Sequence, residues 1–423
     1  MGCYVKRFFI ICFTISISCL GYGQTQNIKV YNIKSFGAKG DGIADDTEAI
    51  QRCFNLAVKS LNAKIVIPYG KYKLRRALVL NYVEGTKEIL GEQQNKTNPT
   101  FVSSSLTDIL VARGYLFKNA ASIFKIKNVT LVGKNLPFSN AHPKINKADW
   151  SAALLIYDKK QANIENVVVK DFYGQGIHIS TTKQEGIPVS ACFQYAEVLN
   201  SKILNVWGYN PQNDSYGDGI YMSNVRRGKI SNNYINNKLS QTGQLGRSGL
   251  VVEYMCKDIL ISNNLVEEGY DRALHVEETD GGHRIINNKL LGSDLGFVLV
   301  EGNQQTSYKS LTFQGNYISN KNLRMLKTVK KTYARANFGD RSLLFIDTKK
   351  LLGSPQINIT DNTFQIDGTF EYDSNVIFNN RSDYVILSDN RFEAKGTAKN
   401  FLIANFSKIE NGNGWKNKVV KVQ

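Results

Sequence analysis

Eight residues between positions 178 and 277 carry side chains that could move protons or hold a charged substrate. They stand in short phrases that alternate apolar with other residues at period two: YGQGIHIS, YGDGIYMS, GRSGLVVE and YDRALHVE. Such alternation is typical of strands with one buried face. The candidates are His178, Asp218, Tyr221, Arg247, Glu253, Arg272, His275 and Glu277.

Glu253 and Glu277 end successive phrases, so stacked strands would bring them about 4.8 Å apart. Two carboxylates this close repel each other unless they share a proton or a cation. The carboxylate that keeps the proton could act as a general acid, and the other as a base or nucleophile. This separation is close to that of a retaining glycosidase, while Asp218 could supply the wider spacing of an inverting one. We therefore predict Asp218, Glu253, His275 and Glu277 as catalytic residues.

The other four candidates are predicted to bind the substrate. Positive groups would hold a sulfate or uronate, and aromatic groups would contact the sugar. This substrate-binding set is His178, Tyr221, Arg247 and Arg272.

Two further functions remain open beside hydrolysis. In a β-elimination, a base such as His178, His275 or Arg272 would remove the proton α to a uronate carboxylate, and Tyr221 would protonate the leaving oxygen. Hydrolysis requires no cofactor or metal, whereas elimination could use Ca²⁺ held by Glu253 and Glu277. The third function is a catalytically silent glycan-binding protein. We favour a glycoside hydrolase over a polysaccharide lyase.

The elements that position these side chains are repeats. A fifth phrase, DLGFVLV, begins at Asp294, and a second type of phrase precedes each of them with a polar residue before an apolar run. These polar residues are 24 to 46 positions apart, and no helix is predicted between them, which indicates a solenoid of parallel β-strands. They are Asn166, Ser201, Asn233, Asn264, Asn288, Asn316, Asn362 and Asn390.

Stacking the repeats predicts interior columns, one of which contains Ile177, Ile220, Leu250, Leu274 and Phe297. The chemical side chains alternate with these residues and would point outward. The recurrent asparagines suit stacked turns, because their amides bond neighbouring backbone and tolerate left-handed geometry. We expect them to be structural.

The segment FGAKGDGIADDTEAIQ, Phe36 to Gln51, resembles the opening of the pectate-lyase-like right-handed parallel β-helix proteins. That superfamily includes polygalacturonases and rhamnogalacturonases, so the resemblance implies an all-β right-handed helix in an exported, glycan-active enzyme. YGDGIYM is similar to the polygalacturonase N-T-D-G-I phrase, which matches Asp218 to its aspartate. The D-D pair, G-H-G and R-I-K of that family do not follow at the expected places.

The acids of this segment have a structural explanation. Asp45 or Asp46 stands where a helix N-cap is needed, and residues about 45–60 read as an amphipathic helix. That helix would cover the open end of the coil stack.

The ends of the chain complete the predicted organisation. Lys6 and Arg7 precede the apolar run Phe8 to Leu20, so residues 1–23 are predicted as a signal peptide of a secreted or periplasmic protein. Residues 24–423 are predicted as one β-helix domain, with coils at about 61–410. Insertions are expected at 91–118, 134–150 and 320–356.

The charge of the chain indicates its partner. Lys and Arg total 53 against 36 Asp and Glu, a formal charge of +17. An exported protein this basic is expected to meet a polyanion, and an acidic polysaccharide fits better than nucleic acid because no nucleic-acid-binding motif is present. Cys53, Cys192 and Cys256 follow no disulfide or metal pattern. We expect a monomer without membrane insertion.

Overall fold

The computed structural model of the chain describes residues 27–118, 121–134, 151–208, 217–237, 246–291, 295–299, 308–319, 342–346, 356–367, 376–380, 385–395, 402–404 and 418–421. The predicted signal peptide lies outside these residues. So do residues 135–150 of the second expected insertion, and most of the third. Within the described part, no helix is long and apolar enough to cross a membrane.

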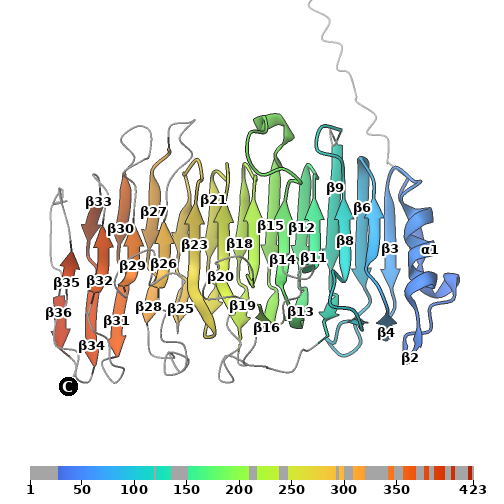
Figure 1. Cartoon of the computed structure of the whole chain (residues 1–423), viewed down its shortest axis with the longest axis horizontal. Coiled ribbons are helices and arrows are strands. Elements are labelled where there is room, and N and C mark those ends of the chain that lie inside the picture. Colours follow the sequence, from blue (N-terminus) through green and yellow to red (C-terminus); the bar gives the residue numbers. More distant parts are fainter. Residues whose placement is uncertain are drawn as a thin grey trace, which may run out of the picture.

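Three parallel sheets run the length of an elongated molecule (Figure 1). In the first, 12-stranded sheet, each strand pairs with its counterpart one coil away. Its strands are β1 Lys29–Asn32, β3 Ala63–Ile67, β6 Glu84–Gly91, β9 Ala121–Lys127, β12 Gln161–Glu165, β15 Tyr195–Leu199, β18 Gly228–Ser231, β21 Ile259–Ser262, β24 Arg284–Ile286, β27 Leu311–Gln314, β30 Ile357–Thr360 and β33 Val385–Ser388.

The second sheet has 13 strands. They are β2 Asp41–Asp45, β4 Lys71–Leu74, β7 Thr100–Ser103, β10 Thr130–Val132, β13 Val168–Tyr173, β16 Lys202–Trp207, β19 Tyr234–Asn236, β22 Leu265–Val266, β25 Lys289–Leu291, β28 Tyr317–Ser319, β31 Thr363–Asp367, β34 Arg391–Lys395 and β36 Lys418–Lys421.

The third sheet has 11 strands and carries the candidate chemistry. They are β5 Leu78–Asn81, β8 Leu110–Arg113, β11 Ala152–Tyr157, β14 Gln175–Ser180, β17 Ile220–Ser223, β20 Gly246–Glu253, β23 Tyr270–Glu277, β26 Leu295–Leu299, β29 Ser342–Ile346, β32 Val376–Asn380 and β35 Leu402–Ala404. The chain visits one strand of each sheet in turn, which confirms the predicted parallel β-helix.

The register confirms the predicted interior column. Ile177, Ile220, Leu250, Leu274 and Phe297 are consecutive partners across β14, β17, β20, β23 and β26. The first four are fully buried in one continuous apolar core. No coil could bury these side chains alone, so the core exists only because the coils stack.

The asparagines form a ladder at the turn between the first and second sheets. Asn264 Oδ1 accepts from the backbone N–H of Asn233 at 3.0 Å, and Asn264 Nδ2 donates to the carbonyl of Ile230 at 2.7 Å. Asn288, Asn316, Asn362 and Asn390 repeat this pattern. Their predicted structural role is confirmed.

Asn166 was assigned to this ladder one position too early. The backbone N–H of Val167 donates to Ser201 Oγ, so Val167 occupies the ladder position. Asn166 instead adopts a left-handed φ of 50°, matching Asn200 at 52°. In the segment ENVVV, residues 165–169, the ladder position is a valine. No polar residue there shows where the ladder runs, so the sequence alone suggested the preceding asparagine.

Two boundaries also differ from the prediction. Residues 91–118 are not a plain insertion, because they contain the coil strands β7 and β8. These two strands have only four residues each and follow the polar loop after β6, so the sequence pattern did not reveal them. The coils also extend past the predicted limit of about residue 410, since β36 pairs with β34.

Helix α1, Thr47–Ala57, packs against β1, β3 and β5 at the N-terminal end of the stack (Figure 1). Asp46 is its N-cap residue but makes no side-chain cap bond. The Asp46 carboxylate instead accepts from the backbone N–H groups of Lys39 and Gly40, at 2.5 and 3.1 Å. Asp45 Oδ1 accepts from the Thr47 N–H. Both acids therefore hold the cap in place.

The three cysteines beyond the predicted signal are buried and free, and they form no disulfide.

Candidate active site

Four neighbouring strands of the third sheet bring the eight candidates together. His178, Tyr221, Val251 and His275 are consecutive register partners across β14, β17, β20 and β23. Glu253 and Glu277 are direct partners at the ends of β20 and β23. The predicted columns therefore form, because a parallel register with side chains of period two aligns equivalent positions.

Arg247 is the electrostatic centre of the cluster. Its Nε and Nη2 contact the two carboxylate oxygens of Asp218 at 2.8 and 2.9 Å, and Nη2 also lies 3.2 Å from Glu253 Oε1. All three side chains are buried. Arg247, a predicted substrate-binding residue, binds two carboxylates of the protein in this structure. One guanidinium thus compensates two acids that would be costly to bury unpaired.

Glu253 and Glu277 lie in contrasting environments. Burial raises the pKa of Glu253 above its usual value. Burial also raises the pKa of Glu277, but the charge and hydrogen bond of His275, with the charges of Arg247 and Arg272, outweigh it and bring the pKa to about 2. Different environments thus favour a proton on Glu253 and a negative charge on Glu277.

His275 lies between the two glutamates. Its Nε2 is 3.2 Å from Glu277 Oε2, and its Nδ1 is 3.9 Å from Glu253 Oε1. One ligand atom from each of these three residues lies within 4.8 Å of the others, so the group is also spaced to share a cation. Arg272 is fully buried, with Nη1 3.0 Å from His275 Nδ1. Its place behind the imidazole is that of a positioning residue.

A second arm of the cluster runs from Asp218 to the aromatic residues. Gln175 Nε2 donates to Asp218 Oδ2 at 3.1 Å, and Gln175 Oε1 accepts from Nδ1 of His178. His178 stacks on Tyr221, with ring centroids 4.5 Å apart. Burial and the charge of Arg247 lower the pKa of His178 to about 3, so its imidazole is neutral. With Nδ1 protonated, His178 Nε2 carries the lone pair, and among the residues that the structure describes this buried atom has no hydrogen-bond partner.

The predicted patch is more enclosed than outward-pointing strand positions suggested. Seven candidates are buried, and only Glu277 keeps substantial exposure, one-third of its side chain. Residues beyond the strands contribute to this enclosure: Gln184 donates to the hydroxyl of Tyr221 at 2.8 Å. Burial raises the pKa of Tyr221 well above its usual value, so its hydroxyl is a proton donor rather than a phenolate.

Sequence reasoning did not assign Gln175 and Gln184 to the site. Gln175 occupies the same strand-entry position as Asp218 and Arg272, which was a readable signal. Gln184 lies in a loop, where no repeat indicates what a side chain will contact.

A family model described as rhamnogalacturonase A/epimerase, pectate lyase-like, matches residues 30–279, which is more than half of the chain. Among curated proteins, mannuronan C5-epimerase AlgE2 of Azotobacter vinelandii is 23% identical over 266 residues, covering 58% of this chain and 25% of the relative. Alginate lyase 7 of the same organism is 48% identical over 44 residues, 10% of this chain and 5% of the relative.

Exo-poly-alpha-D-galacturonosidase of Dickeya chrysanthemi is 29% identical over 119 residues, which are 26% of this chain and 19% of the relative. The chain thus spans a quarter or less of these relatives. Among solved structures, DFA-IIIase of Arthrobacter chlorophenolicus A6 is 12% identical with a TM-score of 0.56, covering 89% of this chain and 87% of the other. That similarity extends to the fold alone.

Proposed function

The chain belongs to the rhamnogalacturonase A/epimerase, pectate lyase-like family, and from that membership we propose that it is an exported hydrolase of a uronate-containing polysaccharide. Three relatives support the substrate class, because their names refer to mannuronan, alginate and poly-α-D-galacturonate. The formal charge of +17 favours the same polyanionic partner.

The observation that carries hydrolysis is the pairing of Glu253 with Glu277. They are register partners, and their carboxylates come within 4.8 Å, near the separation of about 5 Å found in retaining glycosidases. One is buried and the other partly exposed. Their surroundings therefore divide the roles of acid and nucleophile between two identical side chains.

In the proposed reaction, the Glu253 carboxyl gives its proton to the glycosidic oxygen as the bond to the anomeric carbon breaks. The Glu277 carboxylate attacks that carbon and forms a glycosyl ester. Water then loses a proton to Glu253 and releases Glu277, so the protein returns to its starting state. His275 orients Glu277, while Arg247 and Asp218 hold Glu253 in place.

Elimination is the second candidate, favoured by a different observation. His178 presents a neutral Nε2 that has no hydrogen-bond partner within the described part of the chain, and it lies beside Tyr221, so a base and an acid of the kinds that elimination needs are present. Glu253, His275 and Glu277 would hold the cation, which would neutralise the uronate carboxylate.

Polygalacturonate, alginate and sulfated polysaccharides distinguish the two reactions when reducing ends and ultraviolet absorbance are followed together. Hydrolysis gives reducing ends without the absorbance of an unsaturated sugar. E253Q and E277Q should lower kcat by about 10²–10⁴-fold while binding persists. E165Q, which alters an exposed salt bridge on the first sheet, should leave kcat unchanged. A product that absorbs in the ultraviolet, or loss of activity when a chelator is added, would contradict hydrolysis and support elimination. Binding of a polymer without any product would exclude both reactions.

The rate should also depend on pH in a defined direction. The acid Glu253 must be protonated, so the rate should fall as pH rises through its raised pKa. Glu277 stays ionised down to about pH 2, so it sets no limit in the neutral range. A pH profile of kcat/KM with one alkaline limb agrees with these roles. A rate that rises with pH through the same region contradicts them.

A further inference from the structure

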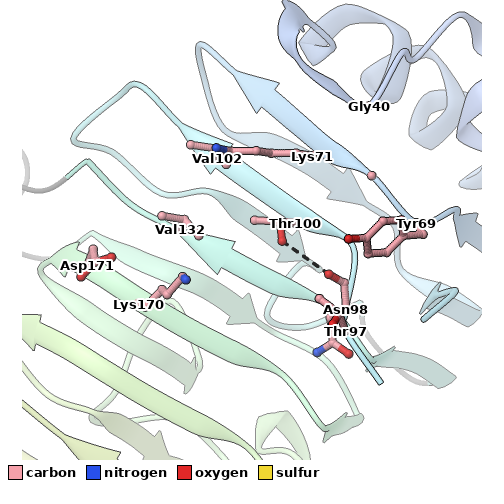
Figure 2. Close-up of a pocket in the computed structure, with 11 residues that line it drawn as sticks. Gly40, Tyr69, Lys71, Thr97, Asn98, Thr100, Val102, Val132, Lys170 and Asp171 are labelled. Carbon is pink, nitrogen blue, oxygen red and sulfur yellow. Dashed lines mark hydrogen bonds between the residues drawn. The ribbon is translucent and has the colours of Figure 1, made fainter. Parts of the chain in front are cut away.

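A groove of about 510 Å³ opens on the second sheet, near the N-terminal cap (Figure 2). Its floor is the outer face of β7 and β10, where Thr100 pairs with Thr130 and Val102 pairs with Val132. Tyr69, just before β4, stands at one end, and Lys170 of β13 lies at the other. The candidate active site occupies a different sheet, and of its strands only β14 shares a coil with the groove, through β13. The groove is therefore a separate site.

Three kinds of group line the groove. Val102 and Val132 give an apolar floor, Thr100 and Asn98 offer polar atoms, and Tyr69 is an aromatic side chain that is 46% exposed. The lining is about as polar as it is apolar, which makes it more polar than the usual small-molecule site. An exposed tyrosine beside hydroxyl and amide groups suits a sugar, which has an apolar ring face and a polar rim.

The charges select an anion. Lys71 and Lys170 project from β4 and β13, on opposite sides of the floor (Figure 2). Within the described part of the chain, neither ammonium has a hydrogen-bond or ion-pair partner. Asp171 is the one acid among the lining residues, and its Oδ1 already accepts from Asn205 Nδ2 at 2.9 Å. Lys73, exposed on β4, adds a further positive charge nearby.

The groove is built rather than accidental. Gln94 and Thr97 exchange two backbone hydrogen bonds, closing a turn beside the groove, and Gln93 Nε2 donates to Asn98 Oδ1 at 2.8 Å. Asn98 Nδ2 reaches the Asn166 carbonyl two coils along. With strands about 4.8 Å apart, the floor and its two lysines span about 14 Å, enough for a short oligosaccharide.

We propose that this groove is a second, non-catalytic binding site for a uronate segment of an acidic polysaccharide. Lys71 and Lys170 would contact carboxylates of the chain, and Tyr69 would stack on a sugar ring. The uronate identity rests on the proposed function, while the anionic character rests on the groove itself. A polymer held here and at the third sheet would be bound at two points, raising its effective concentration at the active site.

Affinity electrophoresis through gels containing alginate, polygalacturonate or neutral dextran tests the proposal. The E277Q protein is used so that the polymer is not consumed. It should be retarded by at least one uronate polymer and not by dextran. K71A/K170A should weaken that binding about tenfold, or about 1.4 kcal/mol, and Y69A should weaken it further. Added salt should reduce the difference.

The matched control is K125A/K229A, which removes two exposed lysines from β9 and β18 of the first sheet. If both double variants lost the same affinity for the polymer, the effect would come from net charge alone, and the proposed binding site would be wrong. Retardation by neither uronate polymer, or equal retention by duplex DNA, would overturn it too. The two proposals fail separately: binding through the groove without product overturns the hydrolase alone, whereas cleavage with binding insensitive to K71A/K170A overturns the groove alone.

Discussion

Arg247 shows how one residue can determine whether a cluster of acids stays buried. It contacts Asp218 through two nitrogen atoms and Glu253 through one of them. Without it, the buried Asp218 carboxylate and the Glu253 carboxyl group would both lose the cation that contacts them. Its role in the proposed hydrolysis is therefore to hold Glu253. The contribution of this residue can be measured as a change in the free energy of unfolding when it is replaced.

R247M should destabilise the fold by about 3–5 kcal/mol, because it leaves buried acids unpaired. Adding D218N should recover part of the loss, since it removes one of the orphaned charges. Urea unfolding gives both values. R76M is the control, because its salt bridge with Glu48 is exposed and should be worth less than about 1 kcal/mol. If R247M and R76M lowered the free energy of unfolding equally, the contacts of Arg247 with Asp218 and Glu253 would not stabilise the fold more than an exposed salt bridge does.

The sequence predicted which residues are register partners on neighbouring strands. It predicted less well which groups their side chains contact. Period-two alternation placed Glu253 opposite Glu277 and His178 opposite Tyr221, since a parallel stack permits one register. It did not reveal that Arg247 would turn toward Asp218, because the direction of a long side chain depends on its neighbours rather than on the repeat. Nor did it predict the second groove, which combines strands of the second sheet with turns outside the repeated phrases.

At the scale of elements, the ladder of asparagines sets the spacing of the coils. Each ladder asparagine satisfies a buried backbone N–H on one side and a buried carbonyl on the other, as Asn264 does for Asn233 and Ile230. Repeats from 24 to 46 residues long can therefore share one turn geometry. Insertions fall elsewhere in the coil without disturbing the stack.

N264A should cost about 2 kcal/mol or more, because it strands a buried N–H and a buried carbonyl that water does not reach. N163A is the matched control: Asn163 is half-buried on the outside of β12, and among the described residues its side chain donates only to Glu197. Its loss should cost well under half as much. Denaturant unfolding of both variants measures the difference. If both lost the same free energy of unfolding, the asparagine ladder would not be a special source of stability.

The strands themselves were predictable where they repeat a phrase and obscure where they do not. The five repeated phrases all became strands of the third sheet, whereas β7 and β8 were read as an insertion because they are only four residues long and follow a polar loop. Short strands in this fold are stabilised by the coils above and below them rather than by local propensity. A single sequence shows that support only after the stack is known.

At the scale of the molecule, the chain is a one-dimensional stack with helix α1 at one end (Figure 1). Each coil contacts mainly its neighbours, so stability should be local rather than shared evenly. Phe54 is fully buried in the core cluster that includes the first coils, whereas Leu56 on the same helix is 43% exposed. Introducing an aspartate at each of these two positions therefore tests the cap.

F54D should release the cap, because an unpaired carboxylate cannot be buried against β1, β3 and β5. The amides of these strands should then lose hydrogen-exchange protection while those of β14, β17, β20 and β23 keep theirs, and light scattering should rise as unpaired strand edges associate. L56D introduces the same aspartate on the exposed side of the helix and should change neither measurement. If F54D lowered protection equally along the whole stack, the coils would form one cooperative unit, and the candidate active site would depend on the cap rather than on its own neighbours.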